Sequence, residues 1–215
     1  KRTRNALVGA DYSTKMSAWL AHGCITPRRI MTCIAGYERT LSGEIQIQMQ
    51  METRGGLVGD CDDTAPVTMG NAGGGGTKGT KGPAVLEIEA RLHSAYWVGF
   101  ELLWRDYAHL VATQLGPKLY ALGGVHGEIG AAKHPWRRDV ALLTAWKSGL
   151  TGYPFIDANM RELLLTGYMS NRGRQVVASF LVRDLGLDWR LGAVHFQKHL
   201  LDHDIASNYV NWQYS

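Results

Sequence analysis

The last third of the chain, residues 151–212, places polar side chains close to large apolar ones. Two acids, an asparagine and a tryptophan fall together between Asp202 and Trp212. Buried polar groups need hydrogen-bonding partners, and a plain packed core offers few of them. The segment therefore predicts a core that surrounds a polar cofactor.

Apolar residues recur at three- and four-residue spacing through much of the chain, which predicts helices. Within residues 95–115 one charged side chain, Glu101, falls inside such a stripe, so we expect it to be paired or to face a cavity. Arg105, one turn later, is the nearest candidate partner. The predicted stripe consists of Trp97, Glu101, Trp104, Ala108, Val111 and Leu115, and further helices are predicted at 154–165, 175–185 and 192–201.

Residues 17–34 predict a helix, a turn and a second helix, with Thr26 as N-cap and Pro27 at the first helical position. Residues 44–51 alternate polar and apolar side chains, which predicts one strand. The Gly/Thr/Lys tract at 73–82 predicts a flexible linker. We expect an all-α fold in three parts, namely a first helical part at 1–35, a low-complexity insertion at 36–90 and a main helical part at 91–215.

Composition excludes several classes of protein. The net charge of +4 and the pI near 9.0 are compatible with a polyanionic partner but not with a polybasic tail. Cys24, Cys33 and Cys61 have no zinc-binding spacing and cannot form a closed set of disulfides, which favours a reducing compartment. No apolar run reaches the length of a membrane span. We therefore expect a soluble, intracellular protein.

Three histidines could align on one helix face. His195, His199 and His203 are spaced four residues apart, with Asp202 beside the last, which would suit metal ligands. The acids at 202 and 204 predict the end of the helix, so we expect His203 to leave that face. The preferred prediction is no metal, and a metal site is the alternative.

A cluster of hydroxyls and a cation precedes the first apolar helix. It comprises Ser13, Thr14, Lys15 and Ser17, with Met16 among them. The backbone amides at a helix N-terminus suit phosphate oxygens. An ordinary capping box would use the same residues, so both interpretations stay open on spacing alone.

Several segments together resemble the photolyase/cryptochrome flavoproteins. They are Asp11–Cys24, Phe100–Tyr107, Thr151–Pro154 and the Asn-Arg-Gly-Arg-Gln run at 171–175, and the ending Ser207–Tyr214 is similar to the cryptochrome-DASH branch. The resemblance implies the helical FAD-binding domain of that family. It also implies that the chain is a fragment without the amino-terminal α/β antenna domain, where a folate-type chromophore would bind, and without the closing helices after Ser215.

The same resemblance assigns residues to FAD. The segment 13–17 would hold the diphosphate with Arg105 nearby, Asp202 and Asp204 would contact the flavin edge and the ribityl chain, and Asn208 would face flavin N5. Arg174 would pair with Asp184 against the ring system. The implied cofactor-binding set is Ser13, Thr14, Lys15, Met16, Ser17, Arg105, Arg174, Asp184, Asp202, Asp204 and Asn208.

The implied activity is light-driven repair of cyclobutane pyrimidine dimers in DNA by an electron from reduced FAD. Extruding a lesion is least costly in single strands, which suits the DASH branch. Lesion contacts would come from Glu101 and Asn171, with Trp104 and Tyr168 as aromatic walls and Arg172 beside the DNA. A monomer is expected.

Three tryptophans match the family's electron-transfer chain. Trp136, Trp189 and Trp212 would run from the surface to the flavin, although spacing alone would equally suit core residues. Tyr168 stands where many photolyases have Trp, and Val210 stands where DASH proteins usually have Gly. The alternative function is a blue-light photoreceptor that signals rather than repairs. The resemblance does not distinguish the nucleus from the chloroplast or the mitochondrion.

Overall fold

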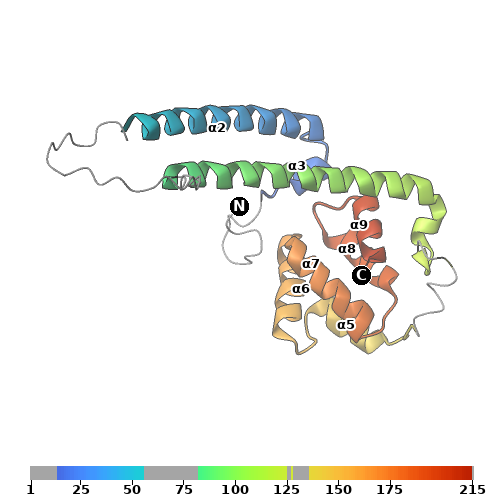
Figure 1. Cartoon of the computed structure of the whole chain (residues 1–215). Coiled ribbons are helices and arrows are strands. Elements are labelled where there is room, and N and C mark those ends of the chain that lie inside the picture. Colours follow the sequence, from blue (N-terminus) through green and yellow to red (C-terminus); the bar gives the residue numbers. More distant parts are fainter. Residues whose placement is uncertain (1–13, 56–81, 125–126, 128–135, 215) are drawn as a thin grey trace, which may run out of the picture. The chain divides into compact units, whose positions relative to one another are not determined.

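The computed structural model describes residues 14–55, 82–124, 127 and 136–214. Within these residues the structure is helical, and its one β-type contact is an isolated bridge between Arg137 and Leu187. The helices are α1 (Ser17–Ala21), α2 (Pro27–Gly55), α3 (Pro83–Leu115), the 3₁₀-helix η1 (Gly116–Tyr120), α5 (Val140–Ser148), α6 (Pro154–Thr166), α7 (Asn171–Ser179), the π-helix η3 (Phe180–Asp184), α8 (Trp189–His199) and α9 (Ile205–Gln213) (Figure 1). The all-α prediction is confirmed.

The chain forms two compact units. Among the described residues, the first unit lies within 31–99, and the second combines 14–30 with those from 100 to 214. None of the described helices is long and apolar enough to cross a bilayer.

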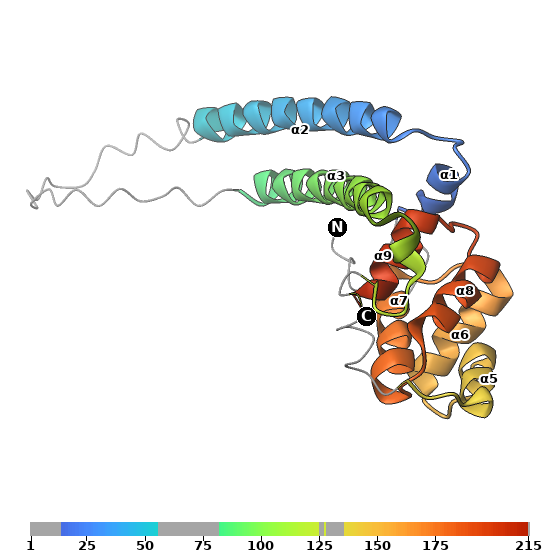
Figure 2. The same ribbon diagram turned by 90° about the vertical axis from the view of Figure 1, so that its right-hand side faces the viewer.

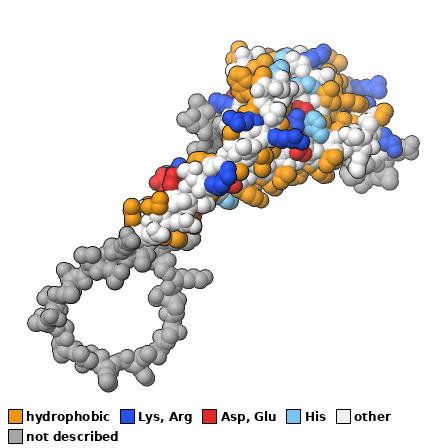
Figure 3. All heavy atoms as spheres, turned by 90° about the horizontal axis from the view of Figure 1, so that it is seen from above, with side chains coloured by type: hydrophobic (Ala, Val, Ile, Leu, Met, Phe, Trp, Pro, Cys, Tyr) orange, Lys and Arg blue, Asp and Glu red, His pale blue; other side chains and the backbone are white. Residues whose placement is uncertain are grey.

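The face drawn in Figure 3 shows hydrophobic side chains next to Lys and Arg side chains on the described surface.

The first unit is a pair of antiparallel helical segments from α2 and α3. Arg91 Nε donates to the Tyr37 hydroxyl at 2.9 Å, and its guanidinium lies 3.4 Å from the Glu44 carboxylate. Leu41 and Val85 are fully buried. Hydrophobic packing therefore holds the pair together, since exposed ion pairs contribute little.

The predicted strand at 44–51 is wrong, because this segment lies inside α2. Gln, Met and Glu are good helix formers, and a strand would need a neighbouring strand for its backbone groups. The alternating residues Ile47, Met49 and Met51 are exposed. The predicted linker lies outside the described residues, except for Gly82 just before α3.

The predicted cap near the amino end is confirmed, and α6 begins at the predicted residue. Thr26 Oγ1 accepts from Arg29 N at 3.2 Å, and Pro27 begins α2. Pro154 begins α6, and Gly167 ends it with φ +69°, a left-handed conformation that favours glycine.

Several boundaries differ from the prediction. The helix predicted at 175–185 begins four residues earlier at Asn171, because Ser170 caps it, and continues as η3. The helix predicted at 192–201 begins at Trp189, because the Asp188 carboxylate accepts from Arg190 N at 2.9 Å. The predicted stripe of α3 is confirmed only in part: Ala108 is buried as predicted, whereas Glu101 and Trp104 are exposed, and Leu102, outside the stripe, is buried.

In the second unit, α5 to α9 lie together (Figure 2), and a few large side chains form the core between them. Trp146, Met160, Leu163 and Leu181 are fully buried there. The indole of Trp146 donates to the Val177 carbonyl at 3.1 Å, which joins α5 to α7. This core fixes the relative placement of the helices that build the site described below.

Asp157 ties the start of α6 to the turn before it. Its carboxylate accepts from Thr151 N at 2.8 Å, Thr151 Oγ1 at 2.6 Å and Gly152 N at 3.0 Å. Burial raises the pKa of this carboxyl, but hydrogen bonds from Thr151 and Gly152 lower it more, so the net pKa lies below the ordinary 3.8. The charged form is therefore the one that stabilises the turn.

Replacing Asp157 by Ala is expected to lower the free energy of unfolding by about 1–3 kcal/mol at neutral pH, because three donors lose their acceptor. Since the folded pKa is depressed, this contribution is present above pH 3.8 and is lost as the pH falls through the folded value. Urea unfolding at pH 7 and pH 3 measures both effects. The control is Asp139→Ala, which removes only the exposed cap of α5; an equal loss in both variants, or no pH dependence, contradicts this account.

Candidate functional site

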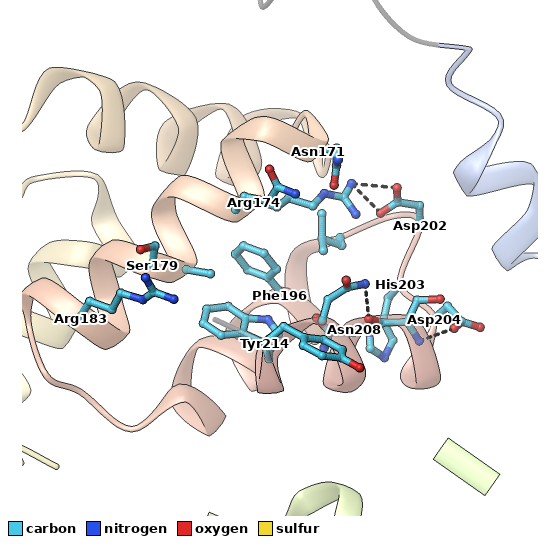
Figure 4. Close-up of a pocket in the computed structure, with 16 residues that line it drawn as sticks. Asn171, Arg174, Ser179, Arg183, Phe196, Asp202, His203, Asp204, Asn208 and Tyr214 are labelled. Carbon is cyan, nitrogen blue, oxygen red and sulfur yellow. Dashed lines mark hydrogen bonds and ion pairs between the residues drawn. The ribbon is translucent and has the colours of Figure 1, made fainter. Parts of the chain in front are cut away.

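A pocket of about 400 Å³ opens between α7, the loop at 200–204 and α9 (Figure 4). This volume is within the range of sites for small molecules and cofactors. Charged and amide groups share its wall with aromatic rings. The lining residues are Asn171, Arg174, Gln175, Ala178, Ser179, Arg183, Phe196, Leu200, Asp202, His203, Asp204, Ser207, Asn208, Asn211, Trp212 and Tyr214.

A buried ion pair forms one end of the pocket. Arg174 Nη2 lies 3.0 and 2.8 Å from the two carboxylate oxygens of Asp202, whose side chain is only 2% exposed. Arg174 Nε also donates to the Met169 carbonyl at 2.9 Å, and its guanidinium lies 5.7 Å from the Tyr168 ring centre. Several contacts thus hold one cation rigidly at the pocket wall.

The predicted pairing of Arg174 with Asp184 is wrong. Asp202 is the partner of Arg174, while Asp184 is exposed at the end of η3 and does not line the pocket. The course of the backbone explains the difference. Arg174 lies near the N-terminus of α7, and the loop after α8 brings Asp202 next to it. Asp184 lies at the far end of η3, away from Arg174.

Asp204 begins α9 and lies in the pocket wall. Its Oδ1 accepts from Ser207 N at 2.8 Å, and its Oδ2 lies 3.0 Å from His109 Nε2 on α3. Burial raises the pKa of Asp204, but the Ser207 backbone and side-chain hydrogen bonds, His109 and Arg105 lower it below the ordinary value. Asp204 therefore remains negatively charged at neutral pH.

Asn208 is held in a defined orientation on α9. Its side-chain nitrogen donates to the Ala193 carbonyl on α8 at 3.1 Å. With the nitrogen engaged, the amide oxygen is the group that can accept a hydrogen bond from a bound molecule. Figure 4 shows Asn208 at the same end of the pocket as His203 and Asp204.

Trp212 forms part of the aromatic wall. It is 4% exposed, and its ring lies 5.1 Å from Phe196 and 6.4 Å from Trp146. Gly192 on α8 makes this approach feasible, because a Cβ there would collide with the Trp212 ring and with Leu181. The close backbone approach requires glycine at this position.

The other two predicted relay tryptophans lie in the same unit. Trp189 is buried, and its indole donates to the Leu122 carbonyl at 2.9 Å. Trp136 is partly buried and packs against the core.

The histidines do not form a metal site in the described part of the chain, where no three potential ligands come together. His195 is buried with its ring 4.3 Å from His199, and burial, followed by His199, Lys147 and Lys198, lowers the pKa of His195 to about 4. His203 lies beyond the end of α8, as predicted. Its two ring nitrogens are buried in the pocket wall and have no hydrogen-bond partner among the described residues.

The predicted phosphate segment is only partly described. Ser13 lies outside the described residues, Thr14 and Lys15 are exposed, and Met16 and Ser17 are half-buried at the start of α1. Lys15 has φ +52°. None of these described residues lines the pocket. Their proposed role stays a prediction.

Of the residues predicted to contact the lesion, one lines the pocket and the others lie outside its lining. Asn171 lines the pocket, while Arg172 and Glu101 are exposed on α7 and α3. Trp104, which is 51% exposed, packs 5.5 Å from the Tyr107 ring. The Tyr107 hydroxyl lies 3.2 Å from that of Tyr214 in the pocket wall, so an aromatic path links Trp104 to the pocket.

The site residues that sequence reasoning missed include His109, Phe196, His203 as a pocket residue, and Tyr214. Only His203 carried a local signal, since it stands between two acids. His109 and Phe196 are parts of helical patterns that look ordinary until the fold brings them to Asp204 and Trp212.

Comparison with known proteins identifies the fold. Residues 97–215 match the family model of the FAD-binding domain of DNA photolyase. The chain is 45% identical over its whole length to cryptochrome DASH of Danio rerio and 41% identical to cryptochrome DASH, chloroplastic/mitochondrial, of Arabidopsis thaliana. It covers 31% and 28% of these relatives, so it spans about a third of their length.

Solved structures agree. A cryptochrome of Synechocystis sp. PCC6803 matches 99% of this chain at 39% identity and a TM-score of 0.69, over 33% of its own length. A bacterial class III photolyase from Agrobacterium tumefaciens matches 61% of this chain at 34% identity and a TM-score of 0.50, over 28% of its length. The chain therefore belongs to the photolyase/cryptochrome family and carries its helical FAD-binding domain in a form similar to the cryptochrome DASH branch.

Proposed function

We propose that the pocket binds the flavin of FAD and that the protein uses it for light-driven repair of cyclobutane pyrimidine dimers in single-stranded DNA. The observation that carries the proposal is the pocket itself, which the Arg174–Asp202 pair, the Asn208 amide and the Trp212 ring all line. A flavin presents a flat apolar ring with hydrogen-bonding edges, which this combination suits.

The residues present fit the cofactor. His203 offers two buried ring nitrogens without a partner among the described residues, and buried polar groups of this kind favour a polar ligand. Burial lowers the pKa of His203, so the ring is neutral and has one donor and one acceptor. Arg174 and the Asn208 amide oxygen add a fixed cation and an acceptor.

When bound, reduced FAD supplies the light-driven electron that splits the dimer. The protein's own groups orient the reactants. Asp202 fixes Arg174, whose positive charge in the pocket wall would favour negative charge on a bound flavin ring. Asn208 would accept a hydrogen bond from flavin N5, and Asp204, charged at neutral pH, would contact the ribityl chain.

Lesion binding is assigned to the surface around the pocket mouth. Asn171 contacts the extruded bases, Glu101 hydrogen-bonds them, and Trp104 and Tyr168 stack on them. Arg172 contacts the DNA backbone. The exposure of Trp104 and its link to Tyr214 through Tyr107 support this assignment. Trp136, Trp189 and Trp212 act as the relay that reduces the flavin in light.

The second candidate function is a blue-light photoreceptor with the same flavin and relay. The buried relay tryptophans serve either function. The Asn208 amide favours repair. An amide does not change its protonation across the physiological pH range, and because its nitrogen donates to Ala193, its oxygen is left to accept a hydrogen bond from the ligand.

The test is repair by the natural, flavin-loaded protein under blue light, with single-stranded DNA that carries thymine dimers. We expect restoration of thymine absorbance with multiple turnovers, and weaker activity on the same lesion in duplex DNA. Asn171→Ala, an exposed change at the pocket rim, should weaken binding of damaged DNA without loss of flavin. Dimers that persist while the flavin is reduced would favour the photoreceptor instead.

A further inference from the structure

A second aromatic path leads from the relay to the protein surface. The Trp189 ring lies 6.2 Å from the Tyr209 ring, which lies 4.8 Å from the Tyr120 ring, and both contacts are edge-to-face. Trp189 is 4% exposed, Tyr209 is 7% exposed and Tyr120 is 46% exposed. The three rings therefore form a continuous row from the core to solvent.

Two hydrogen bonds to the backbone in and just after η1 hold this row in place. The Trp189 indole donates to the Leu122 carbonyl at 2.9 Å, just after Tyr120 in the chain. Gln213 Nε2, on the same helix as Tyr209, donates to the Leu119 carbonyl at 2.8 Å. The row is thus fixed by directional bonds as well as by ring packing.

The inner end of the row is adjacent to the pocket. Trp212 lines the pocket and packs on Gly192, which is one helical turn after Trp189 on α8. The same short stretch of α8 therefore supports both the pocket tryptophan and the first ring of the row. Trp189 is therefore placed to supply an electron to Trp212 when light withdraws one from it.

The two tyrosines differ in what can happen to their protons. A phenol is oxidised easily only if its proton leaves at the same time. The Tyr209 hydroxyl donates to the side-chain amide oxygen of Gln197 at 3.0 Å, and an amide is too weak a base to take the proton. Burial, with a smaller effect of Tyr120, raises the pKa of Tyr209, which further retains its proton. The exposed Tyr120 can release its proton to water.

We infer that Tyr120 is the terminal electron donor of a second exit from the relay, with Tyr209 as the bridge between it and Trp189. The inference rests on the relay in the proposed function and adds to the exit at Trp136. The electron leaves the Tyr120 phenol and reduces the Trp189 radical cation to the neutral indole. The phenolic proton passes to water, and the neutral tyrosyl radical is reduced by a thiol, which gives up one hydrogen atom and becomes a thiyl radical.

The first test uses the flavin-loaded natural protein and a short blue-light pulse. Transient absorbance and electron paramagnetic resonance should detect an indole radical that is replaced by a phenoxyl radical. Tyr120→Phe should abolish the phenoxyl signal and prolong the indole radical. Tyr153→Phe is the matched control, because Tyr153 is also exposed, at 60%, but packs on Phe180 instead of the row. A phenoxyl signal that survives in Tyr120→Phe overturns the inference.

The second test does not depend on the flavin and so separates this inference from the relay. In the flavin-free natural protein, pulses of azide radical oxidise indoles directly. We expect part of the indole radical population to convert to phenoxyl radical at a rate independent of protein concentration, and this phase should be lost in Tyr120→Phe and in Trp189→Phe. If the phase is unchanged in Tyr120→Phe, the inference is wrong even where light reduces the flavin normally. If the phase is lost while light fails to reduce the flavin, the tyrosine path stands and the proposed photoreduction fails.

Discussion

Replacing Arg174 by Ala is expected to cause the largest loss of stability in the site and to release the flavin. The Asp202 side chain, only 2% exposed, would lose the guanidinium that lies 2.8 Å from it. Removing one partner of a buried ion pair costs about 3–5 kcal/mol, and since Arg174 is 27% exposed we expect about 3 kcal/mol. Urea unfolding and the flavin content of the purified protein measure the two effects.

The matched control for stability is Arg172→Ala on the same helix. Arg172 is exposed, and its hydrogen bond goes to the side chain of Gln175, so the free energy of unfolding should change by less than about 0.5 kcal/mol. A double variant, Arg174→Met with Asp202→Leu, removes both charges and should recover much of the stability. It should still fail to retain flavin. Recovery of flavin binding in the double variant would show that the ion pair only supports the fold.

Replacing Trp212 by Phe is expected to slow light-driven reduction of bound flavin by at least about tenfold, which corresponds to only 1.36 kcal/mol in the activation barrier. Phe is much harder to oxidise than Trp, and Trp212 lies in the pocket wall itself. Repair should be retained when the flavin is reduced chemically with dithionite. Absorbance of the flavin under steady blue light, followed by a dimer-repair assay, measures both.

Trp146→Phe is the matched control for the loss of a buried indole. Trp146 is fully buried and lies 6.4 Å from Trp212, but its own role is to join α5 to α7 through Val177. It should lose stability, by about 1–3 kcal/mol for the lost hydrogen bond and contacts, and keep fast photoreduction. Equal slowing in both variants would mean that packing rather than electron transfer explains the effect of Trp212→Phe.

Helix ends were predictable where capping residues mark them in the sequence. Thr26 with Pro27 and Pro154 with Gly167 fix the ends of α2 and α6, because capping and left-handed glycine act within a few residues. The pattern at 44–51 misled because alternation over so short a segment cannot show whether a neighbouring strand exists. The structure places it in α2, where the good helix formers prevail.

The site, like the helices, has features that local patterns predict and features that they do not. Local patterns were enough to predict an essentially all-helical fold and a polar site within its last third, and the motifs gave a family resemblance that the comparisons confirm. Other contacts became known only from the folded arrangement: Arg174 pairs with Asp202 rather than Asp184, His109 reaches Asp204, and Tyr209 and Tyr120 extend the row from Trp189. The difference lies in how far apart in the sequence the interacting residues are. Caps and periodicity depend on residues within one or two turns, whereas these contacts depend on how the loop after α8 and the end of η1 return to helices that are distant in sequence.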